Sequence, residues 1–355
     1  MQDRTIWVGG DVGAKSFWAA IDFPVMFEGQ EQKPVMRLEN KEFRMTPAGV
    51  RSFIRWVEFK QDEFFEEYSS EEMDPLPICF LMESTGIYSA QLEKMLCVAK
   101  PDLCAIIINP EPIKAYRTSL NVKNKTDLLD SQVIARFGRE RKPVAKEKLP
   151  PEYQTLKELS RARSFLKDQR TALNNFHDNV TNSLAKRMCT NVSKKLDMEI
   201  DGLDREINRI VQKHPAIKHE VNIMISMPGV GMGTAVAILG ELGSLKNYKT
   251  REQIVALCGL NPVKRQSGIS VNVTRLSKKG TPVVRRFLYM CSKTALPRIP
   301  VLQDLYNRLL QRGKTRMQAR CAVMRKMLLL LRGMVKNDQE FKNFEEKVGK
   351  SEKMA

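Results

Sequence analysis

Short apolar runs alternate with amphipathic segments over the first 140 residues, and this alternation constrains the fold more than any other feature of the sequence. Residues 5–24, TIWVGGDVGAKSFWAAIDFP, read as two β-strands joined by a tight glycine-containing turn. Residues 76–86 and 103–110, LPICFLMESTG and LCAIIINP, read as buried strands, whereas 47–59 has the apolar period of a helix. We expect the acidic stretch at 63–75, EFFEEYSSEEMDP, to be a loop. The order β-β-(β)-α-β-α-β-α predicts a mixed α/β sheet.

After about residue 150 the pattern becomes that of long helices. Core positions recur at alternating spacings of three and four in two series: Leu159, Ala162, Leu166, Gln169, Leu173, Phe176 and Val180, then Leu196, Ile200, Leu203, Ile207 and Ile210. The pattern predicts two helices joined near residues 187–192, RMCTNV. They could form an antiparallel hairpin or a coiled-coil seam between chains, and a plain helical linker bundle fits equally well. Their outer faces should be basic, because Arg161, Arg163, Lys167 and Arg170 lie there.

The charge is divided unevenly along the chain. Residues 1–150 hold 21 Lys and Arg against 23 Asp and Glu, so the whole net charge of +18 comes from the remainder. A basic part beside a near-neutral part indicates a polyanionic partner, most simply nucleic acid, although a merely soluble basic protein would have the same composition. The 42% hydrophobic content indicates a globular protein.

Several classes of protein are disfavoured. The chain has only three histidines, and its seven cysteines include no pair with two-residue spacing, which argues against a zinc hydrolase or a zinc knuckle. The first residues do not resemble a signal peptide, and the run KMLLLLRGMV at 326–335 is too short to span a bilayer. We therefore expect a cytoplasmic protein with no membrane contact.

The last third opens with a glycine-rich turn. Residues 225–245, ISMPGVGMGTAVAILGELGSL, predict a short helix, a Pro-Gly-x-Gly turn and a second helix that begins near Thr234. The backbone N–H groups of such a turn, at Gly229 and Gly231, could bind a phosphate, although a simple helix–helix turn explains the same residues. A basic strand-turn-strand and a helix follow, and the apolar helix at 315–335 should be core or subunit interface. The candidate nucleic-acid-binding residues are Gly229, Gly231, Lys264, Arg265, Arg275, Lys278, Lys279, Arg285 and Arg286.

Four carboxylates stand at positions where they could converge. Asp11 ends the first strand and Glu83 ends the strand at 78–83, while Asp127 and Asp130 are three residues apart on a later helix. If the two strands are neighbours, the helix can lay its carboxylates across the sheet edge. Such a group would suit two Mg²⁺ ions and the cleavage or transfer of phosphodiesters. The alternative is that Asp127 is only the acidic first-turn residue that helices favour.

These motifs resemble a known family. The D-x-G at Asp11, the sequence MESTG that begins at Met82 and the K-T-D-x-x-D of Lys125 to Asp130 are similar to the DEDD transposases of the insertion-sequence family numbered 110, with its 1111 subgroup and the Piv-type DNA invertases. The segment 227–289 is similar to the C-terminal transposase domain of that family almost throughout. The resemblance covers both ends of the chain and leaves a variable helical middle.

The resemblance implies a fold and a domain plan. It implies a RuvC-like domain of ribonuclease H fold at 1–148, a helical coiled-coil hairpin at 149–221, and a mostly α-helical C-terminal transposase domain with a helix-hairpin-helix-like element at 222–340. A charged tail would occupy 341–355.

The resemblance also implies a reaction. The C-terminal domain would supply a serine that forms a covalent phosphoserine link to DNA, beside Mg²⁺ held by Asp11, Glu83, Asp127 and Asp130. The family pattern R-x-x-S-G falls on KRQSG, which assigns the nucleophile to Ser267, with Ser270 as its rival. Expected partners are double-stranded DNA at the element ends and target, a guide RNA, and further copies of the chain in a dimer or tetramer. The expected location is the nucleoid of a prokaryotic cell.

Two other functions remain open at this point. A RuvC-like structure-specific DNA endonuclease would use water as the nucleophile and leave Ser267 incidental. A nucleic-acid-binding protein that keeps the fold without catalysis would need neither the serine nor the metal.

Overall fold

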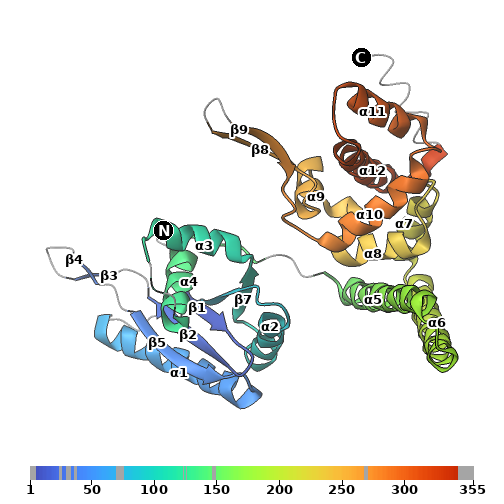
Figure 1. Ribbon diagram of the computed structural model, residues 1–355. Coiled ribbons are helices and arrows are strands. Elements are labelled where there is room, and N and C mark those ends of the chain that lie inside the picture. Colours follow the sequence, from blue (N-terminus) through green and yellow to red (C-terminus); the bar gives the residue numbers. More distant parts are fainter. Residues whose placement is uncertain are drawn as a thin grey trace. The chain divides into compact units, whose positions relative to one another are not determined.

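The computed structural model describes residues 5–23, 26–28, 33–35, 38–68, 76–122, 124, 126–145, 149–267 and 271–342 (Figure 1). The chain divides into two compact units, Met1–Glu147 and Lys148–Ala355. The first unit is a mixed α/β structure, and the described part of the second is helical apart from one two-stranded ribbon. None of the helices in the described ranges is both long enough and apolar enough to cross a membrane.

The first unit is built on a five-stranded sheet with the strand order β5-β2-β1-β6-β7. Its strands are β1 (Ile6–Val12), β2 (Ser16–Asp22), β5 (Leu38–Arg44), β6 (Ile78–Glu83) and β7 (Cys104–Ile108). β1 pairs antiparallel with β2, and β2 with β5, whereas β1, β6 and β7 run parallel. A separate small ribbon pairs β3 (Met26–Glu28) with β4 (Lys33–Val35). The predicted mixed α/β sheet is therefore confirmed.

Helices cover both faces of this sheet. They are α1 (Pro47–Tyr68), α2 (Ile87–Ala99), α3 (Pro110–Ser119) and α4 (Asp127–Arg141). Ile6 and Phe80 point into a cluster that includes side chains of α1 and α2. Trp7 and Leu81, their neighbours in the strands, belong to a second cluster formed with α3 and α4. Because successive side chains of a strand alternate between faces, each residue of β1 and β6 can be assigned to one of these two layers.

α1 is longer than the sequence analysis predicted. The acidic stretch expected to be a loop from residue 63 is helical as far as Tyr68. The cause is tertiary, because Phe64 is 1% exposed and stacks on Phe23 with ring centroids 4.5 Å apart. Burial of this aromatic ring in the first-unit core favours continuation of the helix into the acidic stretch.

The second unit follows the predicted succession of helices. It contains α5 (Pro151–Asn179), α6 (Ser183–Lys213), α7 (Pro215–Ile225), α8 (Met232–Leu242), the short 3₁₀ helix η1 (Leu245–Asn247), α9 (Arg251–Leu257), the strands β8 (Pro262–Ser267) and β9 (Val271–Leu276), α10 (Pro282–Ala295), α11 (Pro300–Gln311) and α12 (Arg316–Asn337). The apolar helix expected to be core or interface is α12, whose Met327 and Leu331 are fully buried.

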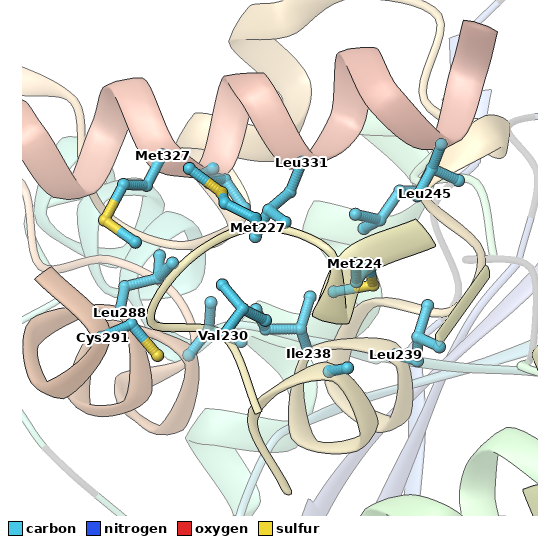
Figure 2. Close-up of a cluster of buried hydrophobic side chains, with 14 of the residues drawn as sticks. Met224, Met227, Val230, Ile238, Leu239, Leu245, Leu288, Cys291, Met327 and Leu331 are labelled. Carbon is cyan, nitrogen blue, oxygen red and sulfur yellow. The ribbon is translucent and has the colours of Figure 1, made fainter. Parts of the chain in front are cut away.

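The turn between α7 and α8 lies at the centre of the second-unit core. Figure 2 shows Met227 and Val230 of this turn among side chains of α8, α10 and α12. Met227 has no exposed surface and Val230 is 5% exposed. The glycine-rich turn is thus fixed by apolar burial on its inner side.

The join between the two long helices was predicted at the wrong place. Residues 187–192 lie inside α6, and the chain turns at Val180 to Asn182 instead. Asn182 is the N-cap of α6 and accepts a hydrogen bond from the N–H of Ala185 at 3.1 Å. Asparagine is among the strongest N-cap residues, so the sequence TNS at 181–183 is the signal for this boundary.

The two long helices form an antiparallel hairpin held by ion pairs. Arg163 and Arg170 of α5 pair with Asp204 and Asp197 of α6. Arg161 binds Glu241 of α8 through two hydrogen bonds. The expectation of basic outer faces is therefore wrong for these three arginines, whose charges are balanced within the second unit.

Candidate active site

Asp11 and Glu83 lie at the same level on neighbouring parallel strands. β1 and β6 are paired in register as far as Gly10 opposite Met82. One step further along this register brings Asp11 opposite Glu83, and residues in register on parallel strands point to the same face. That face is the one on which Trp7 packs against α4. The two carboxylates therefore share one edge and one face of the sheet.

α4 crosses β1 at very close range. A Cβ atom at Gly138 would lie 2.5 Å from the Trp7 indole, and a Cβ at Gly9 would lie 2.2 Å from the backbone nitrogen of Ala135. The helix thus runs antiparallel to β1, with its last turns over Trp7 and its middle over Gly9. Its first turn lies beyond Gly9, toward the end of β1.

The first turn of α4 carries the other two carboxylates. Asp127 is the first residue of the helix, and Asp130 lies one turn on. Thr126 caps the helix by accepting a hydrogen bond from the N–H of Leu129 at 3.2 Å. Asp127 is exposed. A first-turn acid that only interacts with the helix dipole would be exposed as well, so this does not distinguish the two interpretations of Asp127. Asp130 is different, because only 15% of its side chain is exposed.

Asp130 is ion-paired with Arg117 of α3. The same guanidinium donates a hydrogen bond to the carbonyl oxygen of Asn124 at 3.3 Å. Asp130, Glu83 and Arg117 line a single recess of about 460 Å³, together with Lys114 of α3. The carboxylate edge is therefore bordered by two basic side chains.

The donor set of this edge fits Mg²⁺ in its chemistry. All four candidate ligands are carboxylates, and hard oxygen ligands are those that Mg²⁺ prefers. In the conformation of the structure, the described residues include no group of three or more histidine, cysteine or acidic side chains close enough to hold one ion. Asp130 is turned instead toward the guanidinium of Arg117, which supplies the cation at its carboxylate.

Ser267 ends the strand β8 of the basic ribbon. It forms the last pair of that ribbon, opposite Val271, and the residues between them, including Ser270, lie outside the described residues. The backbones of Lys264 and Arg265 belong to β8, but the structure does not describe their side chains or that of Ser267. Arg275 of β9 is exposed.

The two glycines of the α7–α8 turn have different surroundings. Gly229 has φ +89°, and a Cβ atom there would lie 2.9 Å from the carbonyl oxygen of Cys291. Gly231 is the N-cap of α8, and a Cβ atom there would have no heavy atom within 4 Å. Gly229 thus allows close approach to α10, whereas Gly231 lies in an open place at a helix N-terminus.

The remaining basic candidates divide into two groups. Arg285 donates hydrogen bonds to the carbonyl oxygens of Cys258 and Gly280, and Arg286 pairs with Asp168 of α5, so both stabilise the second unit. Lys278 and Lys279, in the turn before α10, are exposed.

Sequence reasoning missed Arg117 and Lys114. Their spacing of three residues on a short helix after β7 gives them a common face, because Ile113 and Tyr116 of the same helix are buried. The signal was present in PIKAYR, but only the fold shows that this helix borders Glu83 and Asp130.

Two family models match the chain. One describes a DEDD transposase of the IS110 type and matches residues 8–184, and the other is described as "Transposase IS116/IS110/IS902 family" and matches residues 221–307. Together the two matches cover well over half of the chain.

Individual relatives agree with these matches. The pilin gene-inverting protein of Moraxella bovis is 26% identical over 270 residues, which are 74% of this chain and 81% of that protein. The corresponding protein of Moraxella lacunata is equally similar. The transposase for insertion sequence element IS1111A of Coxiella burnetii is 24% identical over 238 residues, or 59% of this chain and 64% of that one. With both ends of the chain matched, the protein belongs to the IS110 family of transposases.

Proposed function

We propose that this transposase cuts and exchanges DNA strands at the ends of an insertion sequence through a phosphoserine intermediate, with Mg²⁺ bound by Asp11, Glu83, Asp127 and Asp130 and with Ser267 as nucleophile. The observation that carries the proposal is the path of α4. Its close crossing of β1 at Gly9 brings the first helical turn to the sheet edge that bears Asp11 and Glu83. The mixed five-stranded sheet with helices on both faces also suits a RuvC-like domain of ribonuclease H fold.

When bound by these carboxylates, Mg²⁺ would supply positive charge at the reacting phosphate and would lower the pKa of the attacking hydroxyl. The Ser267 oxygen forms a bond to phosphorus while the bond from phosphorus to the departing strand oxygen breaks. The serine proton passes to a base, and the departing oxygen takes up a proton. One phosphoester replaces another, so the reverse reaction can join a new strand without any further energy source.

The proposal extends to partners. A guide RNA would specify the DNA sites by pairing, with the basic second unit binding nucleic-acid backbone rather than reading bases. The α5–α6 hairpin would join copies of the chain, since it leaves Phe165, Phe176, Met188 and Val192 between 49% and 61% exposed. Exposed apolar residues along both helices are what a seam between chains requires.

The test separates strand transfer from hydrolysis. Labelled element-end DNA is incubated with protein, Mg²⁺ and the RNA transcribed beside the gene, using wild type, Ser267→Ala, Ser270→Ala and Asp130→Asn. We expect Ser267→Ala to lose joined products entirely, Ser270→Ala to keep them, and Asp130→Asn to lose both cutting and joining. Cutting without joining by Ser267→Ala, with free strand ends, would instead support a nuclease that uses water.

A further inference from the structure

The recess beside the carboxylate edge combines two kinds of charge. It is lined by Glu83 and Asp130 and also by Lys114 and Arg117 of α3. Two buried residues fix α3, because Ile113, which also lines the recess, and Tyr116 are 4% and 6% exposed and belong to the cluster formed with α4. α3 therefore presents its basic face to the recess as a rigid element.

Arg117 is held by partners on the carboxylate side. It pairs with Asp130 and donates to the carbonyl oxygen of Asn124. About a fifth of its side chain is exposed, so it is accessible from the recess as well. Lys114, one turn earlier, is more exposed. A guanidinium can bind a carboxylate or a phosphate with the same two-pronged geometry, so a change of partner needs only a small movement.

Charge balance decides which partner Arg117 keeps. Two divalent ions would neutralise the four carboxylates of the edge. With metal bound, the guanidinium at Asp130 would become an excess positive charge beside two cations. An anion in the recess removes that excess, and the substrate of this enzyme supplies one at every nucleotide.

We propose that the recess binds a DNA backbone phosphate that neighbours the phosphate at which the strand is cut, with Arg117 and Lys114 as its ligands. Arg117 leaves Asp130 for this phosphate when metal occupies the carboxylates. The proposal rests on the proposed metal-assisted function. It assigns α3 a role in holding the strand, and it makes Arg117 a competitor of the metal until DNA arrives.

The first measurement needs no DNA and no catalysis. Mn²⁺ is titrated into full-length protein and free Mn²⁺ is followed by electron paramagnetic resonance, for wild type, Arg117→Gln, Arg117→Lys and Arg51→Gln. Arg51 is an exposed residue of α1, on the other face of the sheet, so its variant controls for loss of one charge. We expect Arg117→Gln to bind Mn²⁺ at least threefold more tightly than Arg51→Gln. Equal or weaker binding would overturn the exchange of partners.

The second measurement tests the phosphate. Binding of a fluorescent duplex carrying the element's own end is measured by anisotropy in Ca²⁺ at several salt concentrations. We expect Arg117→Gln and Lys114→Gln each to weaken binding several-fold and to reduce the slope of log K against log[salt] by about 0.9, the value for one lost phosphate contact. Arg117→Lys, which keeps the cation and serves if the glutamine variant does not fold, should retain most of the slope. Slopes for Arg117→Gln and Lys114→Gln unchanged from that of Arg51→Gln would overturn the recess as a phosphate site.

The Mn²⁺ titration and the salt dependence of DNA binding test different parts of the proposal, so one can fail without the other. If wild type binds no Mn²⁺, the proposed metal centre and the exchange of partners are both wrong, and the salt slope still decides whether the recess binds phosphate. If Mn²⁺ binds and the slope does not change, the metal centre stands and the recess has no part in holding DNA.

Discussion

Gly9 determines how closely α4 can approach the sheet. The backbone of α4 lies where the side chain of any other residue at this position would be, with Ser131 O and Ala135 N both 2.2 Å from an ideal Cβ atom. The first turn of the same helix carries Asp127 and Asp130. The absence of a side chain at Gly9 therefore affects both the packing of α4 and the position of these two carboxylates.

Replacing Gly9 with alanine should therefore affect stability and activity together. We expect Gly9→Ala to reduce the free energy of unfolding by about 2–3 kcal/mol, as overpacking against backbone does, and to abolish strand joining because α4 must move. Urea unfolding followed by circular dichroism gives the first quantity. Gly202→Ala is the control, because a Cβ atom at this position in α6 would meet only the end of the Arg205 side chain, at 3.9 Å, and it should change stability by less than about 1 kcal/mol, in the stabilising direction. A stable, inactive Gly9→Ala would contradict the packing argument.

The turn glycines offer a second comparison. Gly229 needs a positive φ and has backbone of α10 in the way of a side chain, so Gly229→Ala should cost about 2 kcal/mol. Gly231 has neither constraint, and Gly231→Ser should be neutral, since serine is itself a good N-cap. Thermal unfolding of the two variants is the measurement. Equal losses from both would mean that the inner packing of the turn in Figure 2 does not fix its conformation.

At the scale of elements, most of the first-unit helices and strands could be predicted, and the reason is periodicity. β6 and β7 are marked by continuous apolar runs, and the apolar residues of β1 and β2 on either side of the glycine turn at residues 13–15 specify a hairpin. The end of α1 could not be predicted, because it depends on Phe64 meeting Phe23 from a distant strand end. The sequence does not show that β1 and β6 are neighbours. Asp11 and Glu83 can lie close together only because they are.

The site was predicted less completely than the elements. The carboxylates follow from strand ends and helix spacing, but Arg117 pairs with Asp130 across two helices, and no local pattern shows that contact. The partners of Arg285 and Arg286 were missed for the same reason. The sequence gives the number of basic residues, but it does not show which of them already form ion pairs or hydrogen bonds within the protein.

The α5–α6 hairpin is the element proposed to join copies of the chain. Leu184, Met188 and Val192 follow one another at spacings of four on α6 and are 54%, 56% and 49% exposed. We expect the double variant Met188→Lys, Val192→Lys to lower the molar mass in solution by at least half, measured by light scattering after size exclusion. Lys194→Met, Lys195→Met, on the same helix, is the control. An unchanged mass for the lysine variant would exclude this stripe as the seam.

At the scale of the whole molecule, each unit has its own core. One buried cluster lies wholly in Lys148–Ala355 and two lie wholly in Met1–Glu147. The basic excess belongs to the second unit, while the candidate carboxylates belong to the first. The proposed reaction therefore needs residues from both units, and the stability of each can be examined by itself.

Alkaline pH should weaken the second unit through a buried phenol. Burial raises the pKa of Tyr248 to about 12, and its hydroxyl donates to the carbonyl oxygen of Leu242 at 2.6 Å. The folded state holds this proton more tightly than the unfolded state, whose tyrosine pKa is near 10, so this contribution to stability is intact below pH 10 and is lost as the pH rises toward 12.

The variant Tyr248→Phe isolates that contribution. It should be less stable than wild type by about 1 kcal/mol at pH 8, where a hydrogen bond is lost, and should lose less stability than wild type between pH 10 and 12, by up to about 2–3 kcal/mol. Urea unfolding at fixed pH values measures both. Parallel curves for the two proteins across that range would show that Tyr248 ionises alike in the folded and unfolded states.

In the proposed reaction, a serine of the second unit attacks DNA with the help of carboxylates in the first. The most direct measurement is to trap the reaction on a nicked suicide substrate, digest the protein and identify by mass spectrometry the peptide that carries the nucleotide. We expect a single modified residue, Ser267, in wild type, and no modified peptide at all in Asp130→Asn. Modification of Ser270, or cleaved DNA with no modified peptide, would contradict it.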